Sequence, residues 1–242
     1  MSRVWRAYHP GLSGEAGATL TLSPEESHHV RRVLRLAPGE PLRVFDGAGV
    51  EWSAVVERAS AREVVVRLVA PYDEGALDPS LRVELLQGWC RPERTDWIVQ
   101  KATELGVASI GLLRVERAEG GRPSPARLLR WQRIAVEACK QSGRRRVPAL
   151  EVVEELPQVA ADALACMPDP APGHPPLARL LTTERPRPVT LAIGPEGGFT
   201  ADERAQALAR GFVLVSLGPR TLRCDTAAIA AVTIVLDRWG DP

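Results

Sequence analysis

The sequence predicts an α/β protein whose main domain contains a parallel sheet and follows a small β-rich domain. Three observations lead to this fold class. Residues 1–70 contain several short, strand-like apolar segments and a single helical segment, which is typical of a small barrel-like β domain. Residues 71–79 (PYDEGALDP) have the composition of a linker. In residues 80–242, strand-like and helix-like segments alternate, which favours a parallel sheet with crossover helices.

The first domain is expected to hold one helix among its strands. The helix begins at Ser23, because a serine N-cap, Pro24 at the first helical position and Glu26 three residues after the cap form a capping box. It is expected to run through Arg35 and to end at Pro38. Extended segments are expected at 3–8, 18–22, 42–45, 51–57 and 63–69.

The second domain is expected to alternate between strands and helices. Strands are expected at 81–86, 108–113, 189–193 and 212–217. Helices are expected at 94–105, 124–141, 200–210 and 225–238. Thr200 and Glu203 form a second capping box. The proline-rich segment 166–176 is expected to be an irregular surface loop.

Composition excludes several classes of protein. The chain has 242 residues, and 45% of them are hydrophobic, which is enough to form a buried core. Its four cysteines form no CxxC motif and are too few for a secreted disulfide scaffold. No apolar run approaches the length of a membrane span, and the first residues lack the apolar stretch of a signal peptide. We therefore expect a soluble, cytoplasmic protein with reduced thiols and no metal.

A net charge of +1 conceals a locally positive region. Residues 114–146 contain ten basic and three acidic side chains, whereas residues 147–170 contain five acidic side chains and no basic one. Such a local excess suits a phosphate-rich partner that binds at one place. The basic triplet 144–146 follows the end of a predicted helix, so a solvated helix end, stabilised by the helix dipole, is the alternative.

A glycine-rich loop carries the strongest local signal for chemistry. The apolar strand 189–193 runs into the loop 194–198 (GPEGG), and a capped helix begins at Thr200. Ligands of open parallel sheets bind at the carboxyl ends of strands, and glycines let the backbone approach a ligand closely. The loop matches neither the dinucleotide fingerprint nor the P-loop. A tight turn is the alternative, but the Glu196 carboxylate has no structural task in such a turn and is a candidate for proton transfer.

A second loop repeats this architecture. The strand 212–217 runs into Gly218 and Pro219, and a helix follows. Arg223 and Asp225 lie at the start of that helix. A loop in which the helix dipole stabilises Asp225 is the alternative. Two strand ends with the same architecture nevertheless favour a shared pocket.

The helix of the first domain also carries charge. Arg31, Arg32 and Arg35 are spaced so that they can cluster on one face. His28 and His29 are adjacent and point in different directions, so they are poor joint metal ligands. We interpret these histidines as structural or as RNA contacts.

The chain resembles the bacterial ribosomal RNA small subunit methyltransferase E family in five motifs, which follow the family's order and cover nearly the whole chain. The motifs are HHVRRVLR at 28–35, KATELGV at 101–107, QSGR at 141–144 with Pro148, IGPEGGF at 193–199 and LGPRTLRCDTA at 217–227. The chain departs from the family where Cys224 and Asp225 replace the usual Thr and Glu, where Lys140 replaces an acid, and where Ala118 stands in place of a common Ser.

The resemblance implies a fold and an activity. The fold would be a PUA-like barrel joined to a SPOUT-class methyltransferase domain whose C-terminal segment forms a trefoil knot, a topology that general folding rules disfavour. Members are homodimers that use S-adenosylmethionine to methylate N3 of a uridine in 16S ribosomal RNA. The partner would be that RNA or the assembled small ribosomal subunit.

The resemblance also implies two sets of binding residues. Three loops would hold the methyl donor through Leu181, Thr182, Ile193, Gly194, Pro195, Gly197, Gly198, Leu217, Gly218, Leu222 and Thr226. RNA phosphates would contact Arg6, Arg31, Arg32, Arg35, Arg144 and Arg146.

Catalysis on N3 of uridine requires the loss of a proton. We expect Glu196 to act as the base or as an anchor, and Arg223 to stabilise the uracil anion. Two alternatives remain. One is a related knotted methyltransferase that acts on another RNA, such as the ribose 2′-oxygen of transfer RNA. The other is a non-catalytic RNA-binding assembly factor.

Overall fold

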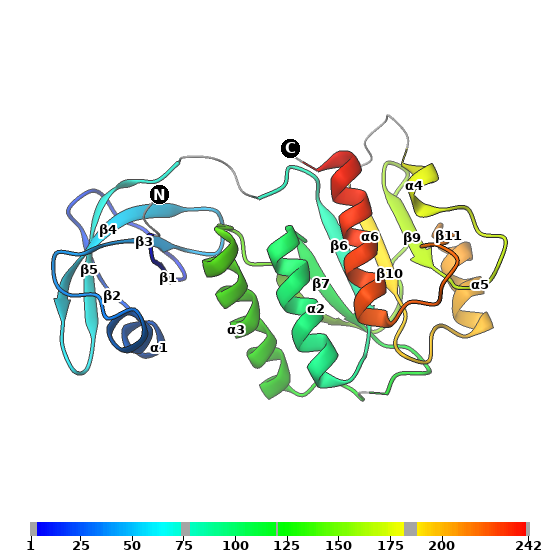
Figure 1. Ribbon diagram of the computed structural model, residues 1–242, viewed down its shortest axis with the longest axis horizontal. Helices are drawn as coiled ribbons and strands as arrows, with labels where there is room; N and C mark the ends of the chain where they lie inside the picture. Colours follow the sequence, from blue (N-terminus) through cyan, green and yellow to red (C-terminus); the bar gives the residue numbers. More distant parts are fainter. Residues whose placement is uncertain (1–3, 74–77, 120, 182–187, 241–242) are drawn as a thin grey trace. The chain divides into compact units, whose positions relative to one another are not determined.

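The computed structural model describes residues 4–73, 78–119, 121–181 and 188–240 (Figure 1). The chain divides into two compact units. The first unit contains the segments Met1–Asp78 and Cys139–Val147. The second contains Pro79–Ala138 and Pro148–Pro242. The first unit thus includes a short segment from the middle of the chain, which the sequence patterns did not indicate.

The first unit is built on a five-stranded sheet with the order β1-β3-β4-β5-β2. Its strands are β1 (Arg6–Tyr8), β2 (Thr19–Thr21), β3 (Pro41–Phe45), β4 (Glu51–Ala59) and β5 (Val64–Pro71). Strand β1 pairs with β3 in parallel, and the other neighbours are antiparallel. Apolar side chains of β3, β4 and β5, among them Leu42, Val56 and Leu68, form a buried core with Val30 of the helical segment. The expected small β-rich unit with one helical segment is therefore present.

The helical segment of this unit is shorter than expected and changes its geometry. The α-helix α1 spans Pro24–His28, and a π-helical turn, η1 (His29–Val33), follows it. Ser23 caps the helix, because its hydroxyl accepts a hydrogen bond from the Glu26 N–H. Arg35 has a left-handed φ of 57°, so the helix has already ended there. The prediction that Arg35 continues a helical face with Arg31 was therefore wrong.

The second unit is built on a six-stranded, all-parallel sheet with the order β11-β9-β10-β6-β7-β8. Its strands are β6 (Val83–Gly88), β7 (Ser109–Leu113), β8 (Ala149–Val153), β9 (Leu164–Pro168), β10 (Val189–Ile193) and β11 (Val213–Val215). Its helices are α2 (Pro92–Leu105), α3 (Pro125–Ser142, whose end belongs to the first unit), α4 (Leu177–Leu180), α5 (Ala201–Ala209) and α6 (Cys224–Trp239). The predicted α/β fold with a parallel sheet is confirmed.

Two strands of this sheet were not expected. Strand β8 was not predicted, and β9 includes the first residues of the segment 166–176, which we expected to be an irregular surface loop. That expectation was wrong for Cys166 and Met167, since both are fully buried between β10 and β11. The prolines that follow these two residues led to the prediction of a loop, although a short internal strand ends there.

Helix α6 closes one side of the sheet. It packs on β10, β6 and α2, and Figure 1 shows α2 and α6 side by side. Apart from Trp239 near its end, its buried side chains are small or β-branched, such as Ala228, Ala231 and Val232, which lets the helix approach the sheet closely. Within the described residues, no helix combines the length and the apolar composition needed to cross a membrane.

Candidate active site

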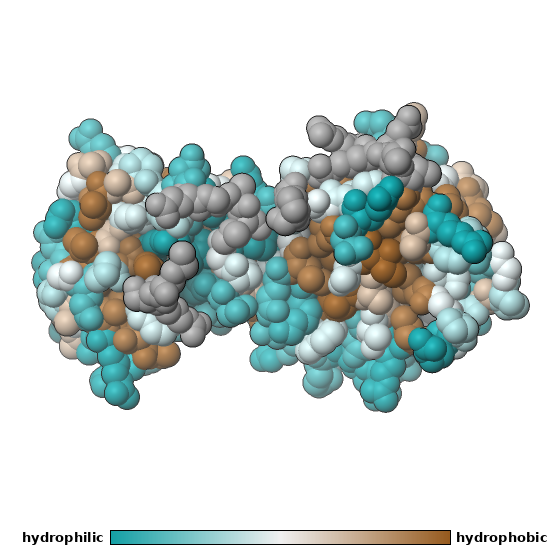
Figure 2. All heavy atoms as spheres, turned by 45° about the horizontal axis from the view of Figure 1, so that its top comes forward, coloured by the Kyte–Doolittle hydropathy of each residue, from teal (hydrophilic) through white to brown (hydrophobic). Residues whose placement is uncertain are grey.

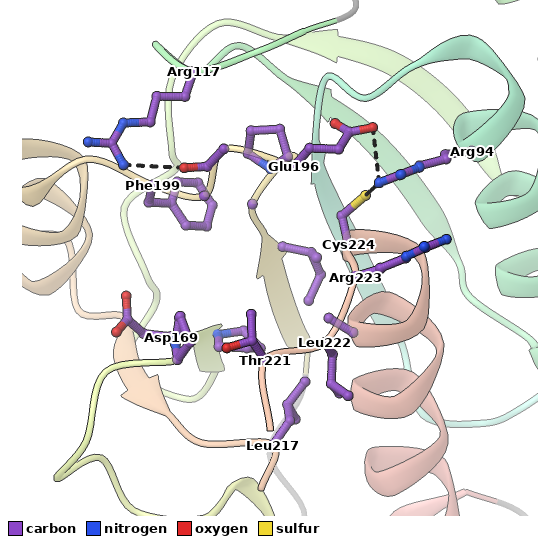
Figure 3. A pocket seen from close by; sticks show the side chains of 18 of the residues that line it. Arg94, Arg117, Asp169, Glu196, Phe199, Leu217, Thr221, Leu222, Arg223 and Cys224 are labelled. Atoms are coloured by element: carbon purple, nitrogen blue, oxygen red, sulfur yellow. Dashed lines mark hydrogen bonds and ion pairs between the residues drawn. The ribbon is translucent and has the colours of Figure 1, made fainter. Parts of the chain in front are cut away.

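The carboxyl ends of three neighbouring strands surround one cavity. Strands β11, β9 and β10 are adjacent and parallel, so the loops that follow them leave the sheet at the same edge. A cavity of about 570 Å³ lies there. Residues of the loops after all three strands line it, and so do Arg91 and Arg94 at the start of α2 (Figure 3). This volume lies within the usual range of small-molecule sites.

The glycine-rich loop after β10 forms one wall of the cavity. Gly198 has a left-handed φ of 67°, which a residue with a side chain would adopt only under strain. A Cβ on Gly194 would lie 3.2 Å from the Gly198 Cα, so the turn closes tightly on itself. The helix α5 then begins at Thr200, whose predicted capping box with Glu203 is present. The sequence pattern therefore predicted this wall correctly.

The Glu196 carboxylate is held at one oxygen only. Its Oε1 accepts a hydrogen bond from the Arg91 N–H at 3.3 Å and pairs with the Arg94 guanidinium at 3.3 Å (Figure 3). Its Oε2 is buried and has no hydrogen-bond partner among the described residues. Buried polar atoms are nearly always paired, so this oxygen is available to a donor that a ligand would bring.

Gln87, near the end of β6, is hydrogen-bonded to the glycine-rich loop. Its side chain is fully buried, and its Nε2 donates hydrogen bonds to the Gly194 carbonyl at 3.3 Å and the Cys90 sulfur at 3.2 Å. The neighbouring Gly88 leaves no room for a side chain, because a Cβ there would lie 2.9 Å from the Pro195 nitrogen. We did not predict this support. The available signal in the sequence was Gln87 itself, because an amide side chain directly after the apolar strand 81–86 needs hydrogen-bond partners when it is buried.

The loop after β11 forms the opposite wall. Leu217 and Leu222 line the cavity with apolar side chains, and Gly218 has a φ of 119°. Arg223 also lines it and is exposed. Its side chain is not directed at the Glu196 carboxylate, which Arg94 reaches instead (Figure 3). Arg94 is thus a functional candidate that the sequence did not single out.

The loop after β9 contributes a buried carboxylate. Asp169 lines the cavity and accepts hydrogen bonds from the Ala171 N–H at 2.8 Å and from Arg204 at 3.0 Å. Burial alone would raise the pKa of Asp169, but these two donors together with Arg204 and His174 charges lower it below its ordinary value. Asp169 was not predicted as a site residue, because the segment 166–176 was expected to be an irregular surface loop.

The remaining predicted donor-binding residues are placed differently. Ile193, Pro195 and Gly197 line the cavity with the glycines of their loop, but Leu181 does not. Leu181 is buried, and its carbonyl accepts a hydrogen bond from Arg238 at 3.2 Å. Thr226 is exposed on the first turn of α6 and is not part of the cavity lining. Thr182 lies outside the described residues.

Two arginines predicted to bind RNA are buried within the first unit. Arg6 is 7% exposed, and its Nε donates to Glu51 Oε1 at 2.8 Å. Arg144 is 3% exposed and pairs with Asp78 at 2.9 Å. Side chains that are buried against carboxylates of their own chain have no charge to offer a phosphate. The RNA-binding prediction for Arg6 and Arg144 was therefore wrong, because a charge pattern does not show which charges fold inward.

The other basic candidates of the first unit keep access to solvent. Arg32, Arg35 and Arg146 are exposed, and Arg31 is half-buried. They remain candidates for contacts with phosphate.

Comparison with known proteins assigns both units. Residues 78–236 match the RNA methyltransferase domain family, and residues 22–69 match the RNA methyltransferase PUA domain family. The chain is 35% identical to the ribosomal RNA small subunit methyltransferase E of Synechocystis, over 91% of this chain and 74% of that protein.

Two solved structures share the fold over nearly the whole chain. One is a methyltransferase from Legionella pneumophila in complex with S-adenosylmethionine, with 36% identity, a TM-score of 0.89 and coverage of 99% of this chain and 100% of that chain. The other is the ribosomal RNA small subunit methyltransferase E of Neisseria gonorrhoeae bound to S-adenosylmethionine, with 30% identity, a TM-score of 0.90 and coverage of 99% of both chains. With its two matching domains and full-length relatives, this chain belongs to the ribosomal RNA small subunit methyltransferase E family.

Proposed function

We propose that the chain transfers the methyl group of S-adenosylmethionine to N3 of a uridine in 16S ribosomal RNA. Family membership supports the RNA methyltransferase class, and two similar structures were solved with this methyl donor. The observation that carries the proposal is the buried Oε2 of Glu196 in the cavity, for which the described residues provide no hydrogen-bond partner. It is the atom that a proton from a substrate would reach.

The cavity suits the proposed donor by its shape and lining. Apolar side chains of Ile193, Phe199, Leu217 and Leu222 offer surfaces for a flat base. The backbone of the glycine-rich loop has no side chains to keep a ligand at a distance. When it is bound there, S-adenosylmethionine supplies an activated methyl group, and the protein supplies orientation and electrostatics.

Methylation of N3 requires a proton acceptor, and we propose that Glu196 has this role. N3 of neutral uridine carries a proton and becomes a good nucleophile only when that proton leaves. The Arg91 N–H and Arg94 occupy Oε1 of Glu196, so Oε2 is the oxygen that accepts the proton. Arg223, exposed on the facing loop, provides a positive charge for O2 or O4 of the uracil anion.

The RNA must present its target base outside a pair. N3 lies on the pairing edge of uracil, so the uridine has to be unpaired or flipped out to enter the cavity. In the proposed complex, Arg31, Arg32, Arg35 and Arg146 contact phosphates, which position the RNA without specifying its sequence. The shape of the folded target then supplies the specificity.

The proposal extends to the assembly and location of the protein. We include a cytoplasmic location, the trefoil knot and the homodimer that the family resemblance implies. An apolar surface supports the dimer. Ile229, Ile234 and Leu236 of α6 are only half-buried, and Figure 2 shows hydrophobic residues gathered on one face of the second unit. Light scattering of the purified chain is expected to give twice the mass of one chain.

A methylation assay with site mapping tests the proposed function. The purified chain is incubated with S-adenosylmethionine and 16S ribosomal RNA from a strain that lacks the corresponding gene. Nuclease digestion and mass spectrometry are expected to find one methylated uridine with the methyl group on the base. A methyl group on the ribose, or methylation of transfer RNA alone, would contradict the proposal. Donor binding without methylation of any RNA would indicate an assembly factor instead.

A further inference from the structure

Two cysteines that are far apart in the sequence meet beside the cavity. The Cys90 sulfur lies 3.3 Å from the Cys224 sulfur, although 134 residues separate them. Cys90 follows β6, and Cys224 is the first residue of α6. Both side chains are buried in the second unit, but only Cys224 lines the cavity. The proposed methyl transfer does not use either thiol.

The two sulfurs have different environments. Cys224 stands at the N-terminus of a long helix, where the dipole favours negative charge. The Cys90 thiol, and Arg94 at 3.8 Å, donate hydrogen bonds to the Cys224 sulfur, and they lower the pKa of Cys224 below its ordinary value despite its burial. The same contact raises the pKa of Cys90. Of the two thiols, Cys224 therefore loses its proton more readily, and Cys90 retains its proton more strongly.

The other two cysteines differ from this pair. Burial raises the pKa of Cys139 to about 11 and that of Cys166 to about 12. Neither thiol is therefore a nucleophile at neutral pH, because the thiolate is the reactive form. Cys166 lies within the core strand β9 and provides an internal reference.

The geometry favours oxidation over metal binding. The sulfurs of Cys90 and Cys224 and a Glu196 oxygen lie within 4.8 Å of one another, which is dense enough for a metal ion. However, two thiolates on a tetrahedral zinc ion lie roughly 3.8 Å apart, given zinc–sulfur bonds of about 2.3 Å. The observed 3.3 Å is closer than that. The Arg94 guanidinium, 3.3 Å from Glu196 and 3.8 Å from the Cys224 sulfur, also places a positive charge beside two of these three groups, which disfavours a cation there.

We propose that Cys90 and Cys224 form a reversible oxidation site, at which a small hydroperoxide that enters the cavity converts the two thiols to a disulfide. Cys224 loses its proton to solvent, and the resulting thiolate attacks the terminal peroxide oxygen. The O–O bond breaks, and the departing alkoxide or hydroxide takes up that proton and leaves as an alcohol or water. The Cys90 sulfur then attacks the resulting sulfenic acid, and its proton leaves with the hydroxyl group as water. Two thiols and one hydroperoxide thus give a disulfide, an alcohol and one water, and a dithiol reductant reverses the reaction.

Disulfide formation changes the wall of the cavity. The two sulfurs have to move from 3.3 Å to about 2.05 Å, and Cys224 directly follows Arg223 of the cavity lining. Arg94 loses the sulfur that accepts its hydrogen bond and keeps its ion pair with Glu196. We expect the oxidised chain to bind S-adenosylmethionine at least about tenfold more weakly. This consequence rests on the proposed function, whereas the thiol chemistry does not.

Peptide mapping tests the thiol chemistry directly. The full chain is treated with hydrogen peroxide at neutral pH, alkylated to block remaining thiols and digested with trypsin. Mass spectrometry is expected to find peptide 83–94 joined to peptide 224–238 with the loss of two hydrogens, and dithiothreitol is expected to separate them. Cys224 is expected to oxidise at least about tenfold faster than Cys166. Oxidation of Cys166 at the rate of Cys224 would overturn the proposal.

Two variants and one metal titration complete the test. In Cys90→Ser no partner remains, so Cys224 is expected to accumulate sulfenic and sulfinic acid. In Cys166→Ala the linked peptides are expected to form as in the unsubstituted chain. Equal sulfinic acid formation at Cys224 with and without Cys90 would overturn the pairing. Stoichiometric zinc binding that blocks alkylation of both cysteines would also overturn it in favour of a metal site.

Calorimetry separates this proposal from the proposed function. Titration of S-adenosylmethionine into the reduced and oxidised chains is expected to show the tenfold loss of affinity only after oxidation. A disulfide without this loss would overturn the effect on the cavity. Failure of the proposed function would appear instead as a reduced chain that binds the donor and methylates no RNA.

Discussion

Each unit of this protein holds a glutamate against arginines, Glu51 in the first unit and Glu196 in the second, and the two carboxylates are paired differently. In the first unit, both oxygens of the Glu51 carboxylate accept hydrogen bonds from arginines. Oε1 accepts from Arg6 Nε at 2.8 Å, and Oε2 accepts from Arg145 Nε at 3.1 Å. In the second unit, Glu196 has partners on one oxygen, and its other oxygen has no hydrogen-bond partner within the part of the chain that the structure describes. A carboxylate with both oxygens paired to its own chain stabilises the fold, whereas an oxygen without such a partner is available to a ligand.

The network around Glu51 shows what a fully paired set of charges does. Arg6 also donates to the carbonyls of Cys139 at 2.5 Å and Arg144 at 2.9 Å, so it holds the segment Cys139–Val147 within the first unit. Lys140 in the same segment forms an ion pair with Glu26. Burying charges is costly, so such a network persists only when its partners are complete. Through this network, the segment Cys139–Val147 becomes part of the first unit.

The largest expected effect is on catalysis. Glu196→Gln keeps the shape of the side chain and removes the proton acceptor, so methyl transfer is expected to fall by about 10²- to 10⁴-fold. The affinity for S-adenosylmethionine, measured by calorimetry, is expected to change by less than about threefold. Glu119→Gln is the matched control, because Glu119 also lines the cavity and pairs with Arg91. Equal rates in the two variants would remove Glu196 from the mechanism.

The next effect is on stability. Glu51→Gln removes the carboxylate that pairs with the buried Arg6 and with Arg145, and it is expected to cost about 3 kcal/mol of unfolding free energy. Glu57→Gln breaks an exposed pair with Arg67 and is expected to cost less than about 1 kcal/mol. Urea unfolding followed by circular dichroism measures both. Similar costs would show that burial does not distinguish the two pairs.

A smaller effect is expected on RNA binding. The double variant Arg32→Ala and Arg35→Ala removes two exposed positive charges, so the slope of log affinity against log salt is expected to decrease by about 1.4. Filter binding at several salt concentrations measures that slope. Arg58→Ala is the control, because this exposed arginine pairs with Glu63 and is expected to leave the slope unchanged. Identical slopes for both variants would place the RNA elsewhere.

The smallest effect concerns pH. The folded state lowers the pKa of Asp169, so the ionised form is favoured in the folded chain. The resulting stability is present above the ordinary aspartate value, near pH 4, and is lost as the pH falls through the lower folded value. Asp169→Asn is expected to lose about 1 kcal/mol at pH 7, and its difference from the unsubstituted chain is expected to shrink as the pH falls below the ordinary aspartate value. A constant difference across this range would contradict the pKa assignment.

Local patterns predicted the elements that local interactions decide. The strand 189–193 was predicted to the residue, because a continuous apolar run followed by glycine leaves few alternatives. The start of α5 at Thr200 was correct, because its capping box depends only on neighbouring residues. In contrast, the capping box expected at Ser23 is incomplete. The Glu26 carboxylate accepts a hydrogen bond from the distant Tyr8 N–H at 3.3 Å and pairs with Lys140.

Residue types and spacings were enough to predict the fold class, the glycine-rich loop and its carboxylate. These features depend on glycine backbone freedom, apolar runs and helix caps, which act over a few residues. Tertiary structure alone decides which charges are satisfied. Arg94 lies 102 positions from Glu196, and Arg6 lies 45 from Glu51, so only the folded chain brings these groups together. Burial is the physical reason. A charged group in water is stabilised by hydration, whereas a buried one loses that hydration and needs an oppositely charged or hydrogen-bonding partner.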